Sequence, residues 1–359
     1  RADRRAGRLV YERYVPEEQP LREALCTLGN GYFATRGAAE EEHAGGVHYP
    51  GTYLAGGYDR AETYLAERWI ENEDLVNWPN WLPLTFRPEG GDWLSLDDVQ
   101  VLEFRQALDL RAGLLTRRVR IRDRTDRETE LVAERLVHMR DPHLAALRWT
   151  LIPRNWSGTV HLRSLIDGSV INAGVARYRQ LEGRHHEVIE SGAAGEEVVY
   201  LTVRTRQSKI RTCQATRTRV TVLGQPAAVT RERFEGEGRV GQTLRLAAEK
   251  GREIEVEKVA ALHTIRDRAI ADPRSASIAD VERAPGFEAL RRSHETAWKE
   301  LWSRWDMRLG GERHPAQGIL RLHLFHLLQS VSPHTIDLDV GVTSRGLHGE
   351  AYRGHVFWD

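Results

Sequence analysis

The sequence predicts a large antiparallel β-sandwich followed by helices. Short segments in which apolar and polar residues alternate recur from Leu9 to about Ala261, as is typical of strands with one buried and one wet face. Turn-forming residues such as Asp141-Pro142 separate these segments. After Asp272-Pro273 apolar residues recur at three- and four-residue spacing instead, which indicates amphipathic helices.

The predicted strands share apolar side chains at about every second position, with Arg, Thr or Glu between them. They are Leu114–Ile121, Glu130–Val137, Leu144–Leu151, Thr159–Ile166, Val198–Thr205, Arg217–Val222 and Thr243–Ala247. Further breakers lie between them, namely the residues from Asn155 to Gly158 and a glycine-rich run from Gly236 to Gly241. So many antiparallel strands favour a sandwich of two sheets.

The composition is that of a folded protein of more than one domain. The 359 residues include 40% hydrophobic and 29% charged residues, which is enough apolar surface for a sizeable core. The 52 basic and 52 acidic residues cancel, which argues against a nucleic-acid partner. Two cysteines indicate a reducing compartment. Without an apolar signal core or a run of membrane-spanning length, we expect a cytoplasmic protein that binds no membrane.

Two helices are predicted after the strands. From Gly286 to Trp305 an apolar stripe indicates an amphipathic helix that packs in the core and links two parts of the chain. From Pro315 to Ser330 a second helix is apolar nearly all round, which is typical of an inner helix. His323 and His326 on it are three residues apart and could share a metal. No third ligand is close in the sequence, so we expect core histidines bonded to backbone and no metal site.

A segment from Val331 to His355 has little helical period and contains Pro333 and several glycines. Loops longer than about a dozen residues are usually either functional or disordered. The apolar Val340 and Leu347 argue against disorder. We therefore expect an ordered loop of the kind on which binding sites are built.

The chain ends in the sequence RGLHGEAYRGHVFWD. A pyranose ring has an apolar face and a rim of hydroxyls, so a site for it needs an aromatic surface and planar polar groups. Phe357 and Trp358 can supply the aromatic surface, and for Phe357 core packing is the alternative. Arg353, His355 and Asp359 can supply the polar groups. We predict a sugar-binding site there.

Two groups of motifs together resemble glycoside hydrolase family 65, whose members include maltose, trehalose and kojibiose phosphorylases and some hydrolases. The motifs are Leu25–Gly37 (LCTLGNGYFATRG), Tyr49–Asp59 (YPGTYLAGGYD) and Leu75–Leu82 (LVNWPNWL), and then Arg345–Asp359. The resemblance implies an N-terminal β-sandwich at 1–270, a helical linker at 271–312, and at 313–359 the beginning of an (α/α)6 catalytic barrel that is truncated in this chain.

The resemblance also implies a carbohydrate-active enzyme. The expected reaction is inverting phosphorolysis of an α-glucosyl disaccharide, such as trehalose, maltose or kojibiose, to glucose 1-phosphate and a sugar. An inverting hydrolase of trehalose-like α-glucosides is one alternative, and a non-catalytic protein that binds carbohydrate or a partner is the other. No cofactor is implied, and inorganic phosphate is the co-substrate of a phosphorylase. A homodimer and a fused upstream domain stay open as partners.

Roles in the site follow from the same resemblance. The Trp-Asp pair that matches Trp358 and Asp359 helps to hold the glucose unit in the family, and we assign these residues that role. Arg353, His355 and Phe357 either bind the substrate as well or support the loop. The general acid of the family is a Glu on a later loop, beyond Asp359. We therefore expect no catalytic residue in this chain and no turnover by the chain alone.

The remaining motif residues are predicted to be structural. Glu350 is expected to brace the C-terminal loop. The N-terminal motif is interpreted as a folding signature of the sandwich that meets the barrel at an interface. Asn77, Trp78 and Asn80 are the residues of that motif that we expect nearest to the site.

Overall fold

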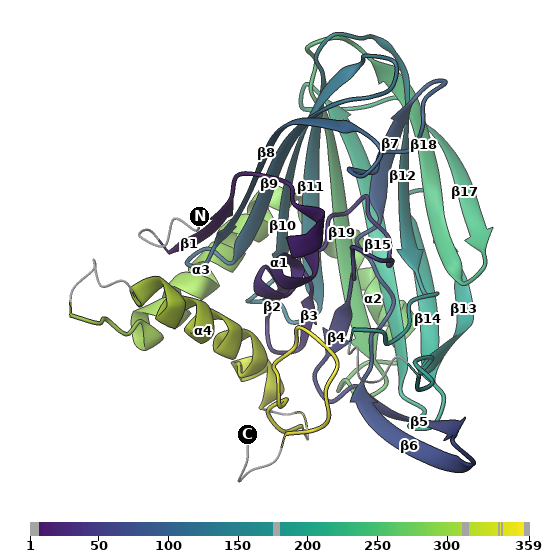
Figure 1. Cartoon of the computed structure of the whole chain (residues 1–359). Coiled ribbons are helices and arrows are strands. Elements are labelled where there is room, and N and C mark those ends of the chain that lie inside the picture. The colour runs from purple at the N-terminus through teal and green to yellow at the C-terminus, as the bar shows by residue number, and fades with distance from the viewer. Residues whose placement is uncertain (1–6, 175–179, 311–315, 337, 339, 355–359) are drawn as a thin grey trace.

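The computed structural model describes residues 7–174, 180–310, 316–336, 338 and 340–354. Antiparallel sheets dominate these ranges and the larger helices follow them in sequence (Figure 1). The predicted antiparallel β-fold followed by helices is therefore confirmed. Among the described residues, no helix combines the length and the apolar character that crossing a bilayer requires.

The largest sheet has ten strands, all antiparallel to their neighbours. In spatial order they are β1 (Arg8–Tyr11), β8 (Gln100–Asp109), β9 (Leu114–Arg122), β10 (Glu128–Val137), β11 (Leu144–Pro153), β19 (Ile254–Thr264), β15 (Arg211–Val222), β14 (Val198–Thr205) and β13 (His186–Ala194), with β16 (Gln225–Pro226) beside β15. Each predicted strand lies within one of the observed strands, so the alternation of apolar residues located these seven segments correctly.

A four-stranded sheet packs against the ten-stranded sheet. Its order is β17 (Thr230–Gly236), β18 (Arg239–Ala248), β12 (Gly158–Asp167) and β7 (Leu84–Pro88). Both sheets contribute to one hydrophobic core, in which Trp149 of β11 and Leu162 of β12 are fully buried. The glycine-rich run was wrongly predicted to lie entirely between strands, because Gly241 lies inside β18. A Cβ there would come within 2.4 Å of Leu165 Cβ, so glycine permits close packing against β12.

Smaller elements build the N-terminal motif. They are a 3-10 turn (Pro16–Glu18), α1 (Gln19–Leu25), the three-stranded sheet of β2 (Leu28–Gly29), β3 (Phe33–Thr35) and β4 (Thr52–Leu54), and the hairpin of β5 (Tyr58–Leu65) and β6 (Arg68–Leu75). Helix α1 was missed by the sequence analysis, since seven residues are too few for a periodic pattern to stand out. The hairpin projects from the sandwich in Figure 1.

Two helices cover the outer face of the ten-stranded sheet (Figure 1). Helix α2 (Pro273–Arg283) begins at Asp272, whose side chain accepts hydrogen bonds from the amides of Arg274 at 2.9 Å and Ser275 at 3.1 Å. Helix α3 (Phe287–Trp305) buries Phe287, Leu290, His294, Trp298 and Trp302. The predicted core role of this stripe is confirmed, except for Trp305, which is 50% exposed.

Helix α4 (Gln317–Ser330) contributes Leu324, Phe325 and Leu328 to the main core. Leu327 on the opposite face is 52% exposed in this chain, so the predicted role as an inner helix of a larger helical domain stays a prediction. The two histidines of this helix, His323 and His326, lie in different environments. His326 Nε2 donates to the Leu25 carbonyl at 3.2 Å, and burial lowers its pKa to about 4, which confirms a core histidine. His323 is exposed, so the same prediction fails for it.

Candidate functional site

The C-terminal loop after α4 and a single 3-10 turn (Pro333–Thr335) is ordered from Val340 to Gly354. Its ends are closed by a bridge between Thr343 and Arg353. The Ser344 hydroxyl donates to the Tyr352 carbonyl at 3.0 Å. Gly354 is required there, since a Cβ would come within 2.1 Å of the Val342 oxygen. The expectation of an ordered loop is confirmed for these residues.

The loop rests on the N-terminal motif. In Figure 1 it is the yellow segment in front of β3 and β4. The Leu75 amide donates to the Ala351 carbonyl at 3.0 Å. The Arg36 guanidinium donates to the His348 carbonyl at 2.7 Å and to the Tyr49 carbonyl at 2.8 Å. A single side chain thus joins the two motifs, which are about three hundred residues apart in the sequence.

Glu350 is the centre of this contact. Its side chain is 4% exposed and accepts hydrogen bonds from the hydroxyls of Tyr49 and Tyr53, the latter at 3.1 Å. Burial raises the pKa of Glu350, although the two hydroxyls favour its charged form. Asn77 donates to the Tyr49 hydroxyl at 3.4 Å. The carboxyl group therefore braces the loop from inside, as expected, and the cavity that it lines has a volume of about 20 Å³, which is too small for a sugar.

Trp78 and Asn80, the other two motif residues that we expected near the site, make their contacts within the sandwich, and their proximity to Trp358 and Asp359 stays a prediction. Trp78 is fully buried and stacks on His186 with 6.2 Å between ring centroids. Asn80 pairs through its backbone with Asp167 in the sandwich. Only Asn77 of the three lies beside the C-terminal loop.

Arg353 lies in the wall of a pocket of about 600 Å³. Its Nε donates to Glu73 at 2.6 Å, and its guanidinium carbon lies 4.8 Å from the centroid of the Tyr58 ring. Arg266 shares the pocket and donates to the Gly56 carbonyl at 2.6 Å. Burial and the nearby charge of Arg353 lower the pKa of Arg266. The pocket combines cationic donors with tyrosines, a lining suited to hydroxyl-rich or anionic groups.

Of the predicted substrate-binding residues, Arg353 is the one that the structure describes. His355, Phe357, Trp358 and Asp359 lie outside the described residues. Their assignment to a sugar site stays a prediction. Sequence reasoning did not assign Arg36, Tyr49 and Tyr53 to the loop contact, although all three belong to stretches of the N-terminal motif that we had interpreted as structural.

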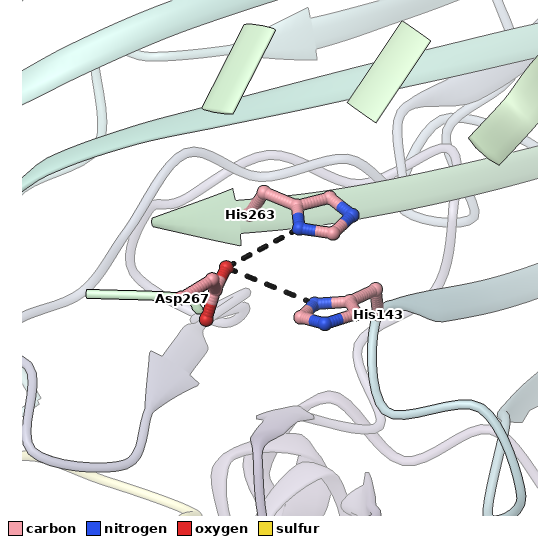
Figure 2. Close-up of side chains that lie close together, drawn as sticks. All are labelled: His143, His263 and Asp267. Carbon is pink, nitrogen blue, oxygen red and sulfur yellow. Dashed lines mark ion pairs between the residues drawn. The ribbon is translucent and has the colours of Figure 1, made fainter. Parts of the chain in front are cut away.

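A cluster of two histidines and a carboxylate lies beside this pocket (Figure 2). His263 at the end of β19 is 3.2 Å from Asp267 through Nδ1 and 2.7 Å from Asp280 through Nε2. His143, in the turn before β11, is 4.0 Å from Asp267. The Tyr32 hydroxyl, which lines the pocket, donates to Asp267 at 2.7 Å. Neither the spacing nor the periodicity of the sequence indicated this cluster.

The geometry of the cluster is that of an ion pair rather than a metal site. The rings of His143 and His263 stack with 3.7 Å between centroids and 18° between planes. Imidazole nitrogens bind zinc at about 2.0–2.1 Å in tetrahedral geometry, and the lone pairs of two nearly parallel rings cannot converge on one ion. Burial opposes protonation of His263, but Asp267 and Asp280 outweigh it and raise its pKa to about 9. His263 is therefore an imidazolium held by two carboxylates.

Replacement of His263 by Asn is expected to destabilise the fold in a pH-dependent way. Because the folded pKa of about 9 lies above the ordinary 6.5, the stabilisation is fully present below pH 6.5 and is lost as pH rises through 9. We expect about 2–3 kcal/mol at pH 6, falling toward zero above pH 9. Thermal melts of both proteins across this range measure it, with exposed His323→Asn as the control. A constant difference would exclude a titrating His263.

Comparisons with known proteins were made for the whole chain. Residues 9–301 match the model of the glycosyl hydrolase family 65 N-terminal domain, and residues 321–359 match that of the family 65 central catalytic domain. An uncharacterized glycosyl hydrolase of Mycobacterium tuberculosis is 42% identical, over 98% of this chain and 26% of its own length.

Relatives with named activities are more distant. A kojibiose phosphorylase of Thermoanaerobacter brockii is 30% identical over 96% of this chain and 44% of its own length. A trehalose 6-phosphate phosphorylase of Lactococcus lactis is 27% identical, over 94% and 42% respectively. A solved structure, that of a putative kojibiose phosphorylase from human microbiome, aligns with a TM-score of 0.82 at 21% identity, over 98% of this chain and 45% of that one, and shows the shared fold. The chain spans less than half the length of these relatives.

Proposed function

Because the chain belongs to glycosyl hydrolase family 65, we propose that the complete protein catalyses inverting phosphorolysis of an α-glucosyl disaccharide, releasing glucose 1-phosphate. The observation that carries the proposal is that relatives along nearly all of this chain are named as phosphorylases of kojibiose and trehalose 6-phosphate. Inorganic phosphate would be the co-substrate. We also propose that the complete protein forms a homodimer.

We also propose which part of the chain forms each domain and which residues bind the sugar. Residues 1–270 would form the sandwich, 271–312 the helical linker, and 313–359 the beginning of the catalytic barrel. The match of residues 321–359 to the catalytic-domain model supports the last boundary. Trp358 and Asp359 would hold the glucose unit, with Arg353, His355 and Phe357 beside them. The general-acid Glu would lie beyond Asp359, so we propose that these residues bind sugar without cleaving it alone.

A second candidate is inverting hydrolysis. It is suggested by the name of the 42% identical relative, an uncharacterized glycosyl hydrolase. The two reactions differ in what attacks the anomeric carbon. A hydrolase needs a carboxylate base to activate water opposite the acid, whereas phosphate is itself an anionic nucleophile and needs cationic and hydroxyl donors.

Incubation of the complete protein with kojibiose, trehalose, maltose and trehalose 6-phosphate, with and without phosphate, tests the proposal. We expect glucose 1-phosphate only when phosphate is present, with one disaccharide strongly preferred. Release of free sugars at the same rate without phosphate would establish hydrolysis instead. Binding of these sugars without turnover in either condition would support a non-catalytic protein.

A further inference from the structure

A second pocket, of about 660 Å³, lies on the outer face of the four-stranded sheet. It shares no lining residue with the pocket that contains Arg353. Strands β17, β18, β12 and β7 form its floor, and the segments 40–48 and 93–97 form its walls. Its volume is within the range of small-molecule sites, roughly 300–1,000 Å³.

The register of the sheet arranges three polar side chains in one row across this floor. Glu232 of β17 lies opposite Thr243 of β18, and Thr243 lies opposite Arg163 of β12. Within the described part of the chain, none of the three side chains makes a hydrogen bond or an ion pair with another protein group. An acceptor, a hydroxyl and a guanidinium thus line the pocket in a row with their hydrogen-bonding capacity free.

The neighbouring row supplies an apolar surface. Phe234 of β17 lies opposite Gly241, which in turn lies opposite Leu165. Phe234 is 45% exposed although it is a large apolar residue. Trp93, from the loop after β7, lines the pocket, and the guanidinium carbons of Arg163 and Arg87 lie 3.9 Å and 4.8 Å from its ring centroid. Aromatic rings beside free polar groups match a ligand with one apolar face and a rim of hydroxyls.

The charges in the pocket favour a neutral ligand. Five carboxylates line the pocket, namely Glu40, Glu41, Glu42, Asp97 and Glu232, against the three guanidiniums of Arg163, Arg233 and Arg239. Arg233 already donates to the Gly195 carbonyl, and Arg239 is already paired with Asp167 at 3.1 Å. An anion at Arg163 would therefore also meet the Glu232 carboxylate. A neutral polyol can instead accept a hydrogen bond from Arg163 and donate one to Glu232, so both groups are satisfied.

From these observations we infer that the pocket is a saccharide-binding site in the sandwich, which takes a short neutral oligosaccharide on Phe234, with Trp93 beside it. Hydroxyls of the sugar would bind Arg163, Thr243 and Glu232. Such a site would hold the enzyme on an oligosaccharide without taking part in the reaction. It does not depend on whether the catalytic reaction is phosphorolysis or hydrolysis.

Equilibrium dialysis of the complete protein with labelled maltotriose, without phosphate, tests the inference. We expect Phe234→Ala and Arg163→Met each to weaken the binding of maltotriose to this pocket on the order of tenfold or more. At a fixed maltotriose concentration, each variant should therefore bind one maltotriose molecule fewer per protein. Turnover of the disaccharide substrate should stay unchanged. The matched control is Trp69→Ala on the β6 hairpin, since Trp69 is 69% exposed and lies outside the pocket.

Two results would overturn the inference. One is unchanged maltotriose stoichiometry and affinity in both variants. The other is displacement by inorganic phosphate of the maltotriose molecule whose binding the substitutions weaken, which would make the pocket an anion site. Phe234 is exposed and Arg163 has no protein hydrogen bond among the described residues, so at least one variant should fold, and thermal melts verify this.

Discussion

Replacing Arg117 by Met is expected to lower the free energy of unfolding by about 3–5 kcal/mol. Arg117 on β9 is 5% exposed and donates to two consecutive carboxylates, Glu41 and, at 2.9 Å, Glu40. Burial works against its charge, but the attraction of Glu41 and Glu40 outweighs it and raises its pKa. Without the guanidinium, Glu41 would lose its charged partner, and Glu40 would keep Arg135 at 3.3 Å and the Trp149 indole N–H at 3.4 Å.

Urea unfolding of Arg117→Met and wild type, followed by circular dichroism, measures this loss. The next residue provides the control. Arg118 points to the other face of β9, where its own side chain is 58% exposed and pairs with Glu130. Glu130 is buried but keeps Arg154 at 2.9 Å when Arg118 is replaced, and an ion pair with an exposed partner contributes about 0–1 kcal/mol. Arg118→Met should therefore be nearly neutral. Equal destabilisation by the two variants would mean that charge on β9, rather than burial of the pair, determines the effect.

Seven strands could be predicted from the sequence because apolar residues alternate in them, whereas β8, β13, β17 and β19 were not identified. What the sequence did not show was that the outer face of the large sheet is covered. Leu136, Leu144 and Val259 on that face pack under α2 and α3, yet the same alternation is compatible with a wet face. The sequence also specifies poorly which face of α3 is buried. Trp298 and Trp302 widen the apolar stripe, so the pattern did not show that Trp305 is exposed.

The site was less predictable because it is assembled from distant segments. Arg353 was identified by its residue type within a motif, and it does line a pocket. The partners of Glu350 could not be identified, since Tyr53 on β4 and Tyr49 just before that strand are about three hundred residues away in the sequence. The same is true of His143 and His263, which only the pairing of β11 with β19 brings together.

Replacing Glu350 by Ala in the complete protein is expected to lower kcat/KM for the disaccharide on the order of 10²-fold. The Tyr49 and Tyr53 hydroxyls would lose their acceptor in a buried site, and the loop that leads to Trp358 and Asp359 would lose its brace. Misplacement of substrate-holding groups by about 1 Å is enough for a loss of this size. Steady-state kinetics with saturating phosphate measures it.

Glu350→Gln separates bracing from acid catalysis. Glutamine keeps an oxygen that can accept from the two tyrosines, so a positioning role predicts activity within a few-fold of wild type and an unchanged pH profile. A general acid must release a proton, so in that case Gln would be as inactive as Ala. Because Glu350 is 4% exposed and both hydroxyls point at its carboxyl group, we expect the Gln variant to be active. An inactive Gln variant with an intact fold would contradict the brace and place Glu350 among the reacting groups.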